Sequence, residues 1–100
     1  MWICFNDGFV SAVKCNDSNM LKIRSRRKEH LEKHFPEKEI HVDVGTDYKY
    51  RVFATKEEFA KIVSDSIMNT KYTNFKNSVN DHDLHDLYAD FWHLHYRYQR

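Results

Sequence analysis

The last twenty residues hold the side-chain types that could do chemistry. If residues 81–100 form a helix, four polar side chains three or four residues apart share one side of it: His82, Asp86, Asp90 and His93. Imidazoles and carboxylates at this spacing could hold a divalent metal ion such as Zn²⁺, or could supply an acid and a base to a small hydrolase. The His-Glu-x-x-His pattern that binds zinc from one helix is missing, and carboxylates near a helix N-terminus also interact favourably with the helix dipole. We therefore favour a solvated helix face, and we expect no cofactor.

The other side of the same helix has the spacing of a buried stripe. Its residues recur at i, i+3, i+4 and i+7, and they are Leu84, Leu87, Tyr88, Phe91, Trp92 and His95. This pattern predicts that the helix closes the domain over its sheet.

A block of basic residues without an acid suggests a second chemistry, nucleic-acid binding. The block consists of Lys22, Arg24, Arg26, Arg27 and Lys28. Beside Tyr48 or Tyr50 on a neighbouring strand, it would offer cations to phosphates and rings to bases. The net charge is only +1, however, and no ribonucleoprotein motif is present. We favour a solvent-exposed sheet face whose basic side chains pair with nearby acidic side chains.

The third candidate is a partner-binding surface on polar segments that carry tyrosines. One is the crossing 69–80, with Tyr72, Asn74 and Lys76; the other holds Tyr48, Tyr50 and Arg51. Long connections in a small domain are often functional, and tyrosine is enriched at binding hot spots. These six residues are the predicted contacts for a protein or ribonucleoprotein partner.

The elements that must position these residues follow from short-range signals. Asp7-Gly8 lies between two strand-like runs and predicts a hairpin, while Thr55 and Glu58 have the spacing of a capping box that opens a helix. Ser25 is the expected N-cap of a helix that Pro36 ends. The expected strands are 2–5, 9–15, 20–24, 40–44 and 48–54. The order βββαββαα predicts an α+β fold, with an antiparallel sheet of about five strands and two to three helices packed on one face.

Length and composition narrow the class of protein. One hundred residues suit a single domain spanning 1–100, and 15% aromatic residues exceed what the core needs, so a homodimer or another binding surface is a reasonable expectation. Cys4 and Cys15 do not face each other in the predicted hairpin, and we expect free thiols. Neither a signal peptide nor a long apolar run is evident, so the expected location is cytoplasmic.

Several segments, in order along most of the chain, resemble a known family. They are Met1-Trp2-Ile3, Gly8-Phe9-Val10-Ser11-Ala12-Val13, Asp47-Tyr48-Lys49-Tyr50-Arg51, Tyr72-Thr73-Asn74-Phe75-Lys76-Asn77-Ser78-Val79 and Tyr88-Ala89-Asp90-Phe91-Trp92. The family comprises short uncharacterised proteins encoded by bacteria and by phages or other mobile elements. The resemblance implies a non-enzymatic interaction protein that binds and modulates a host protein or ribonucleoprotein complex, for example an inhibitor of a defence system such as an anti-CRISPR. A small His/Asp-dependent hydrolase or metalloprotein and a direct RNA-binding protein are the alternatives.

Overall fold

Five strands form one antiparallel sheet in the computed structural model, which describes all residues from 1 to 100. The strands are β1 (Trp2–Phe5), β2 (Gly8–Lys14), β3 (Leu21–Ser25), β4 (His41–Val42) and β5 (Tyr50–Ala54), and their order across the sheet is β1-β2-β3-β5-β4. The helices are α1 (Glu29–Glu32), α2 (Lys56–Met68) and α3 (His82–Tyr98), with a 3-10 turn, η1 (Lys76–Ser78), before the last. The predicted α+β fold and its element order are confirmed. None of the helices combines the length and apolar character needed to cross a membrane.

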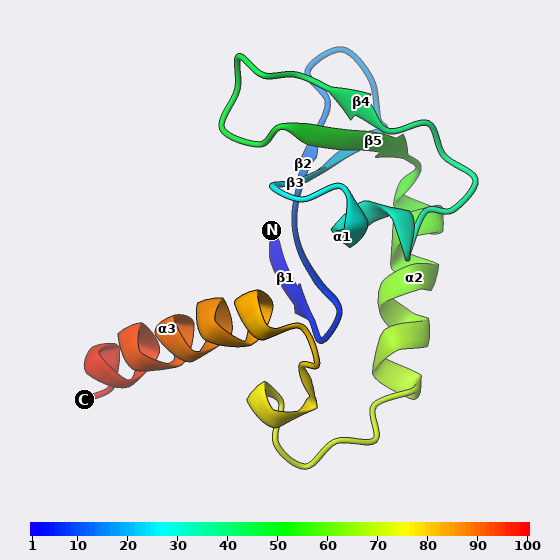
Figure 1. Ribbon diagram of the computed structural model, residues 1–100. Helices are drawn as coiled ribbons and strands as arrows, with labels where there is room; N and C mark the ends of the chain where they lie inside the picture. The colour runs from blue at the N-terminus through cyan, green and yellow to red at the C-terminus, as the bar shows by residue number, and fades with distance from the viewer.

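The main core lies on the sheet face that α1 and α2 cover (Figure 1). Alternate residues of the strands point to this face, and Leu31 and Phe59 reach it from the two helices. The buried cluster is Phe5, Val10, Ala12, Ile23, Leu31, Phe35, Val52, Ala54 and Phe59. Two helices therefore pack on one face, as the sequence predicts.

The capping box at the start of α2 is present in full. The Thr55 side chain accepts a hydrogen bond from the Glu58 N–H, and the Glu58 side chain accepts one from the Thr55 N–H. Lys38 Nζ lies 2.8 Å from Glu58 Oε2, and this contact, with the bond from Thr55, lowers the pKa of Glu58 to about 2. The helix start is thus held both by its own sequence and by the loop before β4.

A second cluster forms on the opposite face, where α3 begins. Phe9 alternates with Val10 along β2 and so points away from the main core, where it joins Tyr48, Val79, Leu84 and Tyr88. The Tyr88 hydroxyl donates a 2.8 Å hydrogen bond to the Phe5 carbonyl. This cluster attaches the first half of α3 and the crossing segment to the sheet.

The β1–β2 hairpin forms at the predicted place, but its glycine serves packing and not turn conformation. Phe5 pairs with Gly8, so Asn6 and Asp7 make the two-residue loop, and no glycine has a positive φ. A Cβ at Gly8 would lie 3.0 Å from the His30 Cβ. Gly8 therefore allows α1 to approach the strand.

Two predicted elements are shorter than their sequence patterns indicate. Ser25 is the last residue of β3, where it pairs with Tyr50, and its hydroxyl donates to the Arg27 carbonyl; the N-cap of α1 is Lys28. The strand predicted over 40–44 is reduced to β4, because the Asp43 carboxylate accepts a hydrogen bond from the Gly45 N–H and turns the chain.

The apolar stripe of α3 is buried over only half of its predicted length. Leu84 and Tyr88 are buried, whereas Trp92 is 49% exposed and His95 is also exposed. A helix of 17 residues is about 25 Å long, and Figure 1 shows its second half extending away from the sheet. The prediction that the whole helix closes over the sheet is wrong, because the domain ends before the helix does.

Acid should weaken the fold through His30. Its Nδ1 accepts a 3.2 Å hydrogen bond from the Phe9 N–H, and burial lowers its pKa from the usual 6.5. The unfolded chain then binds a proton near pH 6.5 that the folded chain binds only at lower pH, so stability is lost as the pH falls below about 6.5.

Urea unfolding between pH 5 and pH 8 measures this loss. The variant His30→Asn keeps an acceptor but cannot titrate, and it should show a flatter pH profile. The control is His82→Gln, which keeps His30 and removes a histidine whose side chain is 87% exposed. This variant should show the same pH profile as the parent protein. Identical profiles for His30→Asn and the parent protein would contradict the assignment.

Candidate partner-binding groove

A groove runs between the crossing segment and the middle of α3. Its volume is about 590 Å³, and the side chains along it are mainly aromatic. The lining residues are Cys4, Thr73, Asn74, Phe75, Lys76, Tyr88, Phe91, Trp92 and His95. We call this feature the aromatic groove.

Local hydrogen bonds and ring contacts fix the shape of the crossing segment. The Asn74 carboxamide oxygen accepts from the Asn77 N–H, and the Ser78 hydroxyl donates to the Phe75 carbonyl. The Phe75 ring packs 5.2 Å from the Tyr88 ring, centroid to centroid. The floor of the aromatic groove is therefore rigid, since it is part of the second core cluster.

Trp92 lines the aromatic groove and contacts both a cation and a second ring. Lys76 Nζ lies 5.1 Å from the Trp92 ring centroid, and Tyr96 stacks on Trp92 at 5.5 Å. Lys76 makes no ion pair with any acidic side chain. The groove thus offers an apolar surface with one unpaired positive charge at its edge.

The six predicted partner-binding residues divide into two groups. Asn74 and Lys76 line the aromatic groove, and Tyr72 packs edge-on against Phe75 beside it. Tyr48, Tyr50 and Arg51 lie at a different place, near the edge of the sheet where β5 begins. Only the residues of the crossing segment therefore adjoin the aromatic groove.

Tyr48 is buried and is not an exposed anchor. The Arg24 and Arg26 guanidinium groups lie 4.6 Å and 4.4 Å from its ring centroid. Tyr50 is half-buried against the main core, and Arg51 donates a 3.0 Å hydrogen bond to the Tyr48 carbonyl. The sequence does not reveal the burial of Tyr48, because its contacts come from β3 and α3, which are distant in the chain.

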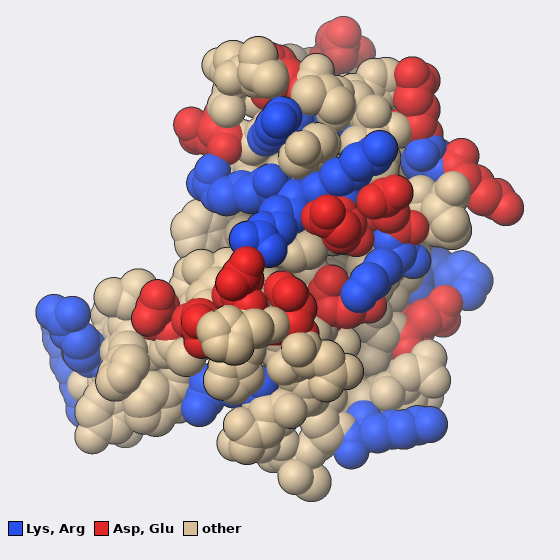
Figure 2. All heavy atoms as spheres, in the orientation of Figure 1, with Lys and Arg blue, Asp and Glu red and all other residues tan.

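The basic block is largely engaged within the fold. Figure 2 shows lysine and arginine side chains in a band across the middle of the molecule, above acidic side chains at the start of α3. Arg24 donates to the Ser11 hydroxyl at 2.8 Å, and Arg26 donates to the Asp47 carbonyl. Arg27 pairs with Asp83 at 3.0 Å and lowers the pKa of that carboxyl. Lys22 and Lys28 make no ion pair, so two of the five predicted nucleic-acid contacts are unengaged.

The His/Asp face of α3 is a row of exposed side chains. His82 Nδ1 lies 3.5 Å from Asp86 Oδ2, which is the only close contact among the four predicted metal ligands His82, Asp86, Asp90 and His93. No three His, Cys, Asp or Glu side chains are grouped so that they could hold a metal ion. The face has the geometry of a solvated helix surface.

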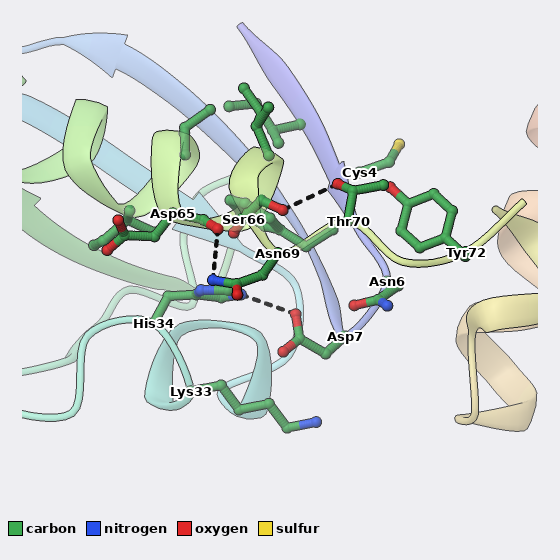
Figure 3. Close-up of a pocket in the computed structure, with 15 residues that line it drawn as sticks. Cys4, Asn6, Asp7, Lys33, His34, Asp65, Ser66, Asn69, Thr70 and Tyr72 are labelled. Carbon is green, nitrogen blue, oxygen red and sulfur yellow. Dashed lines mark hydrogen bonds and ion pairs between the residues drawn. The ribbon is translucent and has the colours of Figure 1, made fainter.

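Sequence reasoning missed a His–Asp pair that the fold assembles elsewhere. His34 Nε2 lies 2.8 Å from Asp7 Oδ1, inside a cavity of about 420 Å³ between the β1–β2 turn and the end of α2 (Figure 3). The Phe5 ring stacks on the imidazole at 4.2 Å. The two residues are 27 apart in the chain, and no local pattern links them.

This pair lacks the neighbours that nucleophilic catalysis requires. No hydroxyl or thiol hydrogen-bonds to the imidazole, and the Thr70 hydroxyl donates to the Ser66 carbonyl instead. Although part of Cys4 is exposed, burial of its thiol raises the pKa, so the nucleophilic thiolate is disfavoured. The geometry supports a structural role for Asp7 and His34, in which they connect the hairpin to the turn that follows α1.

The fold and the aromatic groove define a small α+β protein whose most prominent surface feature is an exposed aromatic helix. No protein-family model matches the chain, and neither a curated protein sequence nor a solved structure matches it.

Proposed function

We propose that this chain is a small non-enzymatic interaction protein that binds a segment of another protein in the aromatic groove. The observation that carries the proposal is the exposure of large apolar side chains around and beyond the groove, with Trp92 at 49% and Tyr96 at 63%. Soluble monomers rarely expose contiguous apolar surface of this kind unless it serves binding. Tryptophan and tyrosine are also the side chains that most often dominate binding energy.

The charges around the aromatic groove favour protein over nucleic acid. Asp83, Asp86 and Asp90 lie on the same helix as Trp92, and the net charge of the chain is +1. The groove itself is lined by a single cation, Lys76, whereas a phosphate backbone is bound through several cations. A protein segment with an apolar anchor and an adjacent carboxylate fits the groove and its single unpaired cation.

The family resemblance supports a partner from a bacterial host. In this proposal the segment belongs to a host protein, either alone or within a ribonucleoprotein complex, and occupancy of the groove modulates that complex. A defence complex is one such target, in keeping with the mobile-element character of the resembling family. Binding measurements on a reconstituted complex can test both the aromatic groove as the surface and the apolar anchor and carboxylate as the groups it binds.

The charge-reversal variant Lys76→Glu should weaken this binding about tenfold, because it replaces the unpaired cation with an anion facing the same carboxylate. The tagged chain is used to capture its partner from host lysate, and the affinity is then measured with the two purified proteins. The matched control is Lys71→Glu, an exposed lysine of the same segment that does not line the groove.

Equal weakening by both variants would indicate a general charge effect and would contradict a specific role for the groove. If the purified partner were a nucleic acid and the affinity fell steeply with salt, the RNA-binding alternative would replace the proposal.

A further inference from the structure

A second apolar row on α3 borders the aromatic groove. One of its members, Phe91, also lines the groove and packs 5.6 Å from the Phe9 ring, and the others are exposed. Counting from the buried Leu84, apolar residues recur at alternating steps of three and four: Leu87, Phe91, Leu94 and Tyr98. This is the a/d repeat of a two-stranded coiled coil. Leu87 is 38% exposed, Leu94 57% and Tyr98 87%. We call these four residues the α3 seam.

Apart from Phe91, which belongs to both, the α3 seam is separate from the groove wall on the same helix. Trp92 and Tyr96 occupy the positions that follow the seam residues by one or two, and so they turn to the side of the helix that faces Lys76. The helix therefore presents two apolar surfaces that meet at Phe91, and the proposed function uses the one that carries Trp92.

Two opposite charges border the seam without partners. Asp90 and Arg97 each precede an a-type seam residue, Phe91 and Tyr98, and they lie seven residues apart on the same flank. Both are exposed, and neither forms an ion pair within the chain. Charges that flank a coiled-coil seam set the orientation of the partner helix.

We infer that the α3 seam is the interface of a homodimer in which two copies of α3 pair antiparallel. A two-fold axis beside Trp92 and His93 places Phe91 opposite Leu94 of the second copy and Leu87 opposite Tyr98 of the second copy. The same axis brings Asp90 next to Arg97 of the second copy, and by symmetry this ion pair forms twice. One register thus satisfies all four seam residues and both unpaired charges.

The position of the sheet domain also requires the antiparallel arrangement. Figure 1 shows that α3 begins beside β1 and that its C-terminal half extends away from the sheet. A parallel pair would bring two domains together at the same end of the helices and would leave Arg97 without an acid. In the antiparallel pair the two domains lie at opposite ends.

The seam residues span about 16 Å of helix, so the contact is short. We expect a dissociation constant on the order of 10 μM, measured by sedimentation velocity over a range of concentrations that brackets this value. Leu94→Ala should raise the constant about tenfold without unfolding the chain, since Leu94 is outside both core clusters. A monomer at all concentrations, or an unchanged constant for Leu94→Ala, would overturn the inference.

Charge reversal tests the register directly. Asp90→Arg alone and Arg97→Asp alone should each weaken the dimer about tenfold, because each replaces two attractions with two repulsions. The double variant restores both pairs in the opposite sense and should return to within threefold of the parent. Arg100→Asp makes the same charge change as Arg97→Asp just beyond the end of α3, outside the seam, and should have little effect.

Additive weakening in the double variant would disprove the antiparallel register. The inference does not rest on the proposed function. Lys76→Glu should weaken partner binding and leave dimerisation unchanged, so the two proposals can fail independently.

Discussion

Trp92→Ala should lower the affinity for the protein partner about 30-fold or more, the largest effect that we expect from any single surface substitution. Its indole lines the aromatic groove and contacts both Lys76 and Tyr96. Truncation of a tryptophan at the centre of an interface typically costs at least 2 kcal/mol of binding free energy. The loss combines the removed ring with the disordering of the cation and the second ring that rest on it.

The same substitution should have a small effect on folding. Trp92 is half-exposed and belongs to neither buried cluster, so the melting temperature should change by only a few degrees. Binding is measured by calorimetry with the purified partner, and stability by thermal unfolding of the free chain. Trp92→Phe retains a ring in the groove and should recover part of the affinity.

The control for Trp92→Ala is Phe53→Ala. Phe53 is also an exposed aromatic residue, but it lies on β5 against His41 and does not line the groove. Its removal should leave the affinity within twofold of the parent. If Trp92→Ala retained full affinity, or if Phe53→Ala lowered the affinity by the same factor, the aromatic groove would not be the binding site.

Gly8→Ala should lower the free energy of unfolding by about 3 kcal/mol, the upper range for forcing an extra methyl group into a packed interior. The added Cβ would lie 3.0 Å from the His30 Cβ and 3.1 Å from its Cα. Because one of these atoms is backbone, α1 itself must move. The movement also strains the hydrogen bond from the Phe9 N–H to the His30 imidazole.

Gly45→Ala is a matched control for Gly8→Ala, since it makes the same chemical change at the only other glycine. The nearest atom to a Cβ at Gly45 is an Asp43 carboxylate oxygen at 3.4 Å, and φ is not positive there. A glycine-to-alanine change at a compatible site is neutral or slightly stabilising, because it restricts the unfolded chain. In chemical denaturation, the free energy of unfolding of Gly8→Ala should be lower than that of Gly45→Ala by at least the amount expected for the clash at Gly8. Equal free energies of unfolding would contradict the packing role of Gly8.

The two surfaces of α3 have a common structural cause. The sheet domain accommodates only the first half of the helix, through Leu84 and Tyr88. Beyond Phe91, the second half keeps large apolar side chains that the chain leaves exposed, namely Trp92, Leu94, Tyr96 and Tyr98. An isolated exposed helix of this length is marginally stable, so binding on either surface should also stabilise the C-terminal turns.

Several elements could be predicted from the sequence because short-range interactions decide them. The capping box of Thr55 and Glu58 and the β1–β2 hairpin each depend on hydrogen bonds between residues at most ten apart. The candidate site was predicted in part: Asn74 and Lys76 do line the groove, because a polar crossing with an aromatic anchor must lie at the surface near the core.

The sequence by itself determined the order of the elements, the starts of α2 and α3, and the apolar spacing of the last helix, since periodicity and capping are properties of neighbouring residues. Only the tertiary structure decided which apolar residues are buried. Tyr48 is covered because β3 and the start of α3 reach it, whereas Trp92 is exposed because no segment does. Asp7 and His34 meet for the same reason, through strand pairing and helix packing over 27 residues. Burial depends on long-range contacts, which a local pattern does not encode.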